Sequence, residues 1–125
     1  MSSEEMQKQA NQINDLSSLI TKLTNFQSAI RDYDRLRLDG AKFLSFEDEE
    51  FQEYAADMDG IRALACGMAG EAVKAELRDP GPIENLCHLG ETDAELDEIQ
   101  LRTVGVALER ALIRAQSSLE KVLMG

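Results

Sequence analysis

Apolar residues recur at three- and four-residue steps through the first third of the chain, which is the spacing of one face of an α-helix. The pattern predicts a helix over residues 3–38, with the apolar residues at the a and d positions of a heptad repeat. Gln9 and Gln27 are the polar exceptions. The apolar positions, widened by Phe26 and Tyr33, are Met6, Ile13, Leu16, Ile20, Leu23 and Ile30. Such a helix is about 50 Å long, so it either breaks or projects from a small domain, and residues 1–12 are either frayed or ordered by a partner.

A second helix is predicted over residues 45–78. Ser45 can cap its first turn, and proline ends it within the sequence Asp79-Pro-Gly-Pro, because proline cannot continue the hydrogen-bond ladder. Each interior glycine weakens a helix by roughly 1 kcal/mol relative to alanine, so a reason for several glycines is needed. Small residues follow one another at steps of three and four, at Gly60, Ala63, Gly67 and Gly70. We expect this ridge of small residues to pack closely against another helix, within the chain or between subunits.

A third long helix is predicted over residues 93–123. Thr92 and Glu95 match a capping box at its start. Its apolar seam, with Ser118 as the polar position, consists of Leu101, Val104, Leu108, Ala111, Ala115 and Val122. Between the second and third helices, residues 81–90 carry apolar residues at three-residue steps and predict a short connector helix.

The composition agrees with an all-α fold. Two prolines and eight glycines in 125 residues disfavour long loops and a multi-stranded sheet, and the length suits one domain. We therefore predict a single helical domain over residues 1–125, with three long helices and a connector, arranged as an antiparallel bundle or a helical dimer. Two long apolar seams in so short a chain also predict a homo-oligomer.

Charge narrows the possible partners. The formal net charge is −11, from 24 acidic and 13 basic residues, which disfavours direct binding to nucleic acid and favours a basic protein partner. Acidic residues gather at the start of the second helix, and the candidate contacts there are Glu49, Glu50, Glu53 and Asp57. The same acids also stabilise the helix start through its dipole. No apolar run approaches the roughly 20 residues that span a bilayer, and the first residues do not resemble a signal peptide, so we expect a cytoplasmic protein without membrane contact.

Metal and catalytic motifs are not found. Cys66, Cys87 and His88 have no recognised zinc spacing, and the sequence Asp57-Met-Asp-Gly lacks the carboxylates of a calcium loop. No glycine-rich phosphate loop follows a strand. We expect neither an enzyme nor a bound cofactor, and the roles of the two cysteines and the histidine stay open.

The sequence thus predicts a small acidic protein–protein interaction module, acting as an adaptor, a chaperone-like escort or an inhibitor. The candidate contacts on the first helix are Ile13, Leu16, Ile20, Leu23, Phe26 and Ile30. Two alternatives remain at this stage. One is an acidic DNA mimic that occupies a nucleic-acid-binding site, and the other is a binder of a small ligand in the helical core.

Overall fold

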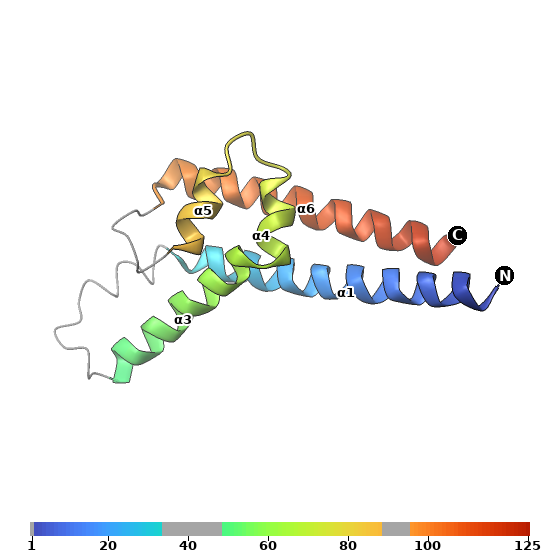
Figure 1. Cartoon of the computed structure of the whole chain (residues 1–125). Helices are drawn as coiled ribbons and strands as arrows, with labels where there is room; N and C mark the ends of the chain where they lie inside the picture. Colours follow the sequence, from blue (N-terminus) through green and yellow to red (C-terminus); the bar gives the residue numbers. More distant parts are fainter. Residues whose placement is uncertain (1, 34–48, 89–95) are drawn as a thin grey trace.

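The computed structural model describes residues 2–33, 49–88 and 96–125, without the side chains of residues 49–55. All regular structure in these ranges is helical, which confirms the all-α prediction for them (Figure 1). The described helices are α1 (Ser3–Arg31), α3 (Glu49–Cys66), α4 (Met68–Lys74), α5 (Gly81–Cys87) and α6 (Glu98–Met124).

Helices α1 and α6 form a long antiparallel pair, and the start of α1 lies beside the end of α6 (Figure 1). The side chain of Gln9 donates a hydrogen bond of 2.9 Å to the carbonyl oxygen of Val122 and joins the two helices there. This end of the pair extends beyond α4, so the long first helix projects, which was one of the two expected outcomes. Helix α1 ends at Arg31, seven residues earlier than predicted, and residues 34–38 lie outside the described ranges.

The start of α1 is capped in the way its sequence allows. The Ser2 hydroxyl accepts a hydrogen bond of 3.2 Å from the backbone N–H of Glu5, and Glu4 and Glu5 lie in the first turn. A serine cap and first-turn acids both stabilise the positive end of the helix dipole. The polar first residues are therefore helical here, and their dependence on a partner stays a prediction.

The predicted second helix is divided at Gly67, so the prediction of one continuous helix was wrong. Gly67 has an extended backbone (φ −95°, ψ −162°) and forms the N-cap of α4. The bend turns Ala69, Gly70 and Val73 of α4 into the core. A Cβ atom on Gly70 would lie 1.7 Å from the carbonyl oxygen of Ala65, so only glycine fits this approach of α4 to the end of α3. The predicted cap at Ser45 lies outside the described residues.

Helix α6 begins five residues later than predicted, at Glu98. Asp97 and Gln100 form its capping box: the Gln100 N–H donates to the Asp97 carboxylate (2.8 Å), and the Asp97 N–H donates to the Gln100 side chain (3.0 Å). Thr92 and Glu95, the expected capping pair, lie outside the described residues. Helix α5 (Gly81–Cys87) lies within residues 81–90, where a short helix was predicted, and the Asp79 carboxylate accepts a hydrogen bond of 2.9 Å from the Gly81 N–H at its start.

The core is mainly aliphatic and rich in alanine, also includes Phe26 and Tyr33, and is enclosed by the five described helices. Its buried residues are Leu23, Phe26, Ile30, Tyr33, Ile61, Ala65, Ala69, Val73, Ile83, Leu86, Leu96, Val104, Ala107, Leu108, Ala111 and Ala115. Helix α6 contributes the predicted seam positions from Val104 to Ala115. The Tyr33 hydroxyl accepts a hydrogen bond of 3.4 Å from the buried Leu96 N–H and fixes the approach to α6. None of the helices in the described ranges combines the length and the apolar character needed to cross a bilayer.

Candidate protein-binding surface

Helix α6 carries apolar residues on the face opposite its core seam. Ile99, Val106 and Ile113 are 76%, 47% and 57% exposed. They are seven residues apart, which is close to two helical turns, so they lie in one line along the helix. We call these three residues the outer stripe. Single exposed apolar residues are ordinary on a protein surface, but three in one line form the kind of edge that another helix covers.

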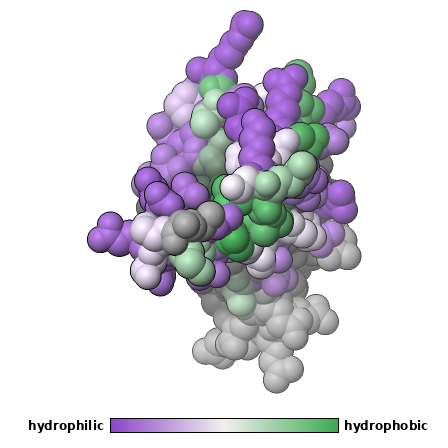
Figure 2. Space-filling model, turned by 90° about the vertical axis from the view of Figure 1, so that its right-hand side faces the viewer, coloured by the Kyte–Doolittle hydropathy of each residue, from purple (hydrophilic) through white to green (hydrophobic). Residues whose placement is uncertain are grey.

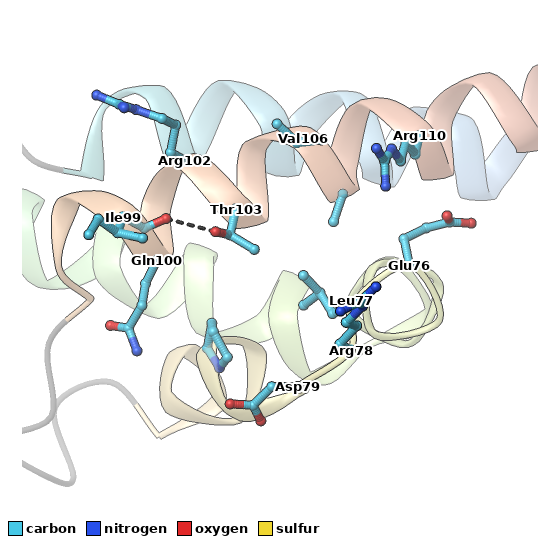
Figure 3. Close-up of a pocket in the computed structure, with 12 residues that line it drawn as sticks. Glu76, Leu77, Arg78, Asp79, Ile99, Gln100, Arg102, Thr103, Val106 and Arg110 are labelled. Atoms are coloured by element: carbon cyan, nitrogen blue, oxygen red, sulfur yellow. Dashed lines mark hydrogen bonds between the residues drawn. The ribbon is translucent and has the colours of Figure 1, made fainter.

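A hollow of about 590 Å³ lies beside the outer stripe, between α6 and the connection from α4 to α5 (Figure 3). We call it the α6 groove. Its lining residues are Glu76, Leu77, Arg78, Asp79, Pro82, Ile99, Gln100, Arg102, Thr103, Val106, Ala107 and Arg110. Leu77, from the connection, faces α6 across this space. The Thr103 hydroxyl donates a hydrogen bond of 2.9 Å to the Ile99 carbonyl oxygen, so this donor is already used within α6.

Three arginines surround the α6 groove. Arg110 extends from α6 on the side of Glu76, whereas Arg102 extends from α6 away from the connection, and Arg78 comes from the connection itself (Figure 3). Within the described ranges, no ion pair joins these three guanidinium groups to a carboxylate. The groove is therefore locally basic, although the chain as a whole has a net charge of −11.

The two acids of the groove are already engaged. The Glu76 carboxylate forms an ion pair of 2.8 Å with Arg114, a residue that does not line the groove. The Asp79 carboxylate accepts the Gly81 N–H at the start of α5. Arg114 therefore neutralises Glu76, whereas Asp79 keeps its negative charge, and the three arginines still outnumber the acids of the lining.

The predicted contact residues of the first helix are divided between core and surface. Leu23, Phe26 and Ile30 are buried by the chain's own helices, so a partner cannot reach them in this conformation. The heptad pattern therefore identified core positions there. Ile13, Leu16 and Ile20 are half-buried and remain partly open to contact.

The predicted ridge of small residues is not continuous. Gly60 and Ala63 are exposed, and Gly67 forms the bend, where a Cβ would lie 3.3 Å from the Ala63 carbonyl oxygen. Gly70 makes the closer approach, to the backbone of Ala65. A shallow hollow of about 250 Å³ next to Gly67 is lined by residues of α1, α3 and α4. The close backbone approach that the glycines indicated exists, but it occurs between two consecutive helices of one chain.

The acidic candidate patch lies at the start of α3. Asp57 is exposed, whereas the side chains of Glu49, Glu50 and Glu53 lie outside the described residues. Two residues later, Asp59 pairs with Arg62 on the same helix. Asp57 is therefore the acid of the described patch that is accessible to a partner.

Cys66 and Cys87 lie together at the ends of α3 and α5. The Cys66 thiol donates a hydrogen bond of 3.5 Å to the Cys87 carbonyl oxygen. Burial, followed by a hydrogen bond and charge repulsion from Cys66, raises the pKa of Cys87 to about 11. His88 forms the C-cap of α5, and its backbone N–H donates to the Asn85 carbonyl oxygen. In the part of the chain that the structure describes, no group of three or more His, Cys, Asp or Glu residues could hold a metal ion.

Comparison of the chain with protein-family models, with curated proteins and with solved structures gives no match. The outer stripe was not among the predicted contact residues, although its spacing is visible in the sequence. Ile99, Val106 and Ile113 repeat at seven residues, out of phase with the core seam of the same helix.

Proposed function

We propose that this protein is a protein–protein interaction module that holds a helix of its partner against α6. The observation that carries the proposal is the outer stripe with a hollow alongside it. Binding of an amphipathic helix in a groove uses apolar anchors at helical spacing, and the seven-residue spacing of the stripe suits such anchors. The protein then acts by binding, as an adaptor, escort or inhibitor, and not by catalysis.

Self-association belongs to the same proposal but uses another part of the molecule. At the projecting end of the α1–α6 pair, Ile13 and Leu16 are half-buried on a helix whose neighbour there is α6. Figure 2 views this end of the molecule and shows apolar surface between hydrophilic side chains. A second copy would cover such surface by forming a larger bundle from two helix pairs.

The test separates the outer stripe from the rest of α6. Partners that copurify from the native host are identified by mass spectrometry, and the binding of the recombinant partner is then measured by calorimetry. Val106→Asp places a charge in the middle of the stripe and should weaken binding at least about tenfold, because an unpaired charge would be desolvated on binding. Gln116→Asp introduces the same charge at an exposed position of α6 outside the stripe and should leave affinity unchanged. Equal affinity of wild type and Val106→Asp would exclude the stripe as the binding surface.

A further inference from the structure

We infer that the helix held in the α6 groove is acidic, an inference that rests on the proposed function. Arg78, Arg102 and Arg110 belong to the lining of the groove, and of its two acids Glu76 is paired with Arg114, so the basic groups outnumber the unpaired acid, Asp79. A guanidinium group binds a carboxylate through a pair of parallel hydrogen bonds, which gives geometric specificity. Charge complementarity therefore selects a partner helix with carboxylates beside its apolar anchors.

The spacing of the arginines defines the pattern on the partner. Arg102 follows Ile99 by three residues, and Arg110 precedes Ile113 by three, so each stands beside the outer stripe. The two arginines are eight residues apart, which is about 12 Å along the helix axis. We expect the partner helix to carry apolar residues about seven apart and carboxylates about two turns apart. Arg78 offers a third contact from the opposite wall.

The net charge of −11 does not prevent this recognition. At physiological ionic strength the Debye length is about 8 Å, so acids on distant parts of the surface are largely screened. The guanidinium groups of the groove act at contact distance, where screening is weaker. Any repulsion from the acidic surroundings slows the encounter with every acidic partner alike, so selection must come from the contacts made in the groove.

The experiment uses three designed amphipathic peptides that differ in a single feature. All have leucine at the a and d positions, and glutamate, glutamine or lysine fills every e and g position. Binding to the full chain is followed by ¹⁵N–¹H correlation spectra, which locate the perturbed amides. The glutamate peptide should bind with perturbations at Ile99, Val106 and Ile113, and about tenfold more tightly than the glutamine peptide, as expected for three exposed ion pairs. Arg102→Glu combined with Arg110→Glu should transfer the preference to the lysine peptide.

Failure of the charge inference is distinguishable from failure of the proposed function. If all three peptides bind equally and Val106→Asp abolishes their binding, the groove binds helices but does not select acids. If the lysine peptide binds best to the wild-type chain, the inferred chemistry is wrong. If no peptide perturbs the outer stripe, the stripe is not a helix-binding surface and both ideas are rejected.

A second inference follows independently from the two thiols. Cys66 ends α3 and is exposed, whereas Cys87 ends α5 and is half-buried, and the Cys66 thiol already donates to the Cys87 carbonyl oxygen. Cys66 is the more accessible thiol and should react first with an oxidant, and the raised pKa of Cys87 further lowers the thiolate fraction of Cys87.

We propose that Cys66 and Cys87 form a reversible disulfide within the chain, with glutathione disulfide as the oxidant. The Cys66 thiolate attacks one sulfur of glutathione disulfide and releases glutathione, which leaves a mixed disulfide on Cys66. The Cys87 thiolate then attacks the Cys66 sulfur and releases the second glutathione. Two protein thiols are oxidised, one glutathione disulfide is reduced to two glutathione molecules, and these take up the two protons.

This disulfide would tie down one wall of the α6 groove. The segment between the two cysteines contains α4 and the connection with Leu77 and Arg78, both of which line the groove. Closing a loop in this way reduces the conformational freedom of the segment in the unfolded chain. Oxidation would therefore stabilise the segment that supplies Arg78 to the partner.

The disulfide is tested by treating the full chain with glutathione disulfide and measuring its intact mass without reductant. The wild type should lose two hydrogens, and trypsin should release residues 63–74 linked to residues 79–102. Cys66→Ser and Cys87→Ser should each stop at a single mixed glutathione adduct. A wild-type chain that carries two glutathione adducts, stays reduced or forms only dimers between chains would overturn the proposal.

Discussion

Replacement of Gly70 by alanine tests the contact that fixes α4 against α3. The added Cβ would lie 1.7 Å from the Ala65 carbonyl oxygen, 2.5 Å from its carbonyl carbon and 3.0 Å from its Cα. Real Cβ contacts are essentially never shorter than 3.0 Å, so the backbone must shift by at least the difference between 3.0 and 1.7 Å, about 1.3 Å. Because the obstructing atoms are backbone, a rotamer change cannot relieve the overlap. The shift would also displace Ala69 and Val73, which are buried.

The magnitude follows from two opposing effects. Overpacking of a core costs about 1–3 kcal/mol, while replacing glycine by alanine within a helix contributes up to about 1 kcal/mol in favour of folding. Because the obstructing atoms belong to rigid backbone, the overpacking cost should lie near the upper end of its range. After the gain in helix propensity is subtracted, we expect the Gly70→Ala change to lower the free energy of unfolding by about 2 kcal/mol. Gly60→Ala is the matched control. Nothing lies within 4 Å of a Cβ at Gly60, so this change should stabilise the protein by about 0.5–1 kcal/mol.

Both variants are compared with the wild type by urea unfolding, followed by circular dichroism. The midpoint of Gly70→Ala should fall and that of Gly60→Ala should rise, at an unchanged dependence on denaturant. If Gly70→Ala is as stable as Gly60→Ala, α4 does not approach Ala65 as described, and the bend at Gly67 must have another cause.

Three further predictions concern other parts of the fold. Asp97→Ala removes the capping box of α6 and should cost about 1 kcal/mol in urea unfolding, whereas Asp97→Ser should retain most of the stability. Folded Cys87 keeps its proton up to about pH 11, against 9.0 for a free thiol, so under reducing conditions stability should fall as pH rises through this window. The Cys87→Ser variant should lose this contribution to the pH dependence of stability, as measured by thermal unfolding between pH 9.0 and about 11. In sedimentation velocity at micromolar concentration the chain should form a dimer or larger species, and Ile13→Asp should weaken it; a monomer at every concentration would contradict self-association.

The periodicity of the two longest helices was visible in the sequence because burial acts on it directly. Leu23 and Ile30 on α1, and Val104 and Leu108 on α6, occupy predicted seam positions and are buried. What periodicity does not determine is whether a seam faces the chain's own helices or a partner. The C-terminal part of the α1 seam, from Leu23 to Ile30, was predicted to contact a partner, but the chain's own core covers it.

Helix boundaries were harder to predict because several local signals competed. Thr92 and Asp97 each begin an acceptable capping sequence, and local chemistry does not rank them. The choice depends on Leu96, which is buried and donates its N–H to Tyr33, a residue far away in the sequence. Tertiary packing thus places Leu96 outside α6, and Asp97 becomes the N-cap of that helix.

The bend at Gly67 was missed because the apolar pattern continues through it. Ala65, Ala69 and Val73 are buried at four-residue steps, as on one straight helix. The backbone nevertheless turns there, since Gly70 allows α4 to approach the end of α3. The α6 groove was not predicted for a related reason. Its second wall comes from Leu77 and Arg78, and the local sequence does not show that these residues lie opposite α6.

The alanines on the core face of α6 constrain how the sequence can diverge. Ala107, Ala111 and Ala115 are buried at four-residue steps, and such small side chains bring helix axes close to the lower end of the usual range of about 8–10 Å. A larger residue at any of these sites would push neighbouring helices apart unless a facing residue shrank in compensation. Relatives of this chain should therefore preserve small residues at these positions, or exchange size with the residues opposite, while the exposed faces vary freely. This pattern of paired size changes would identify the fold after most of the surface sequence has changed.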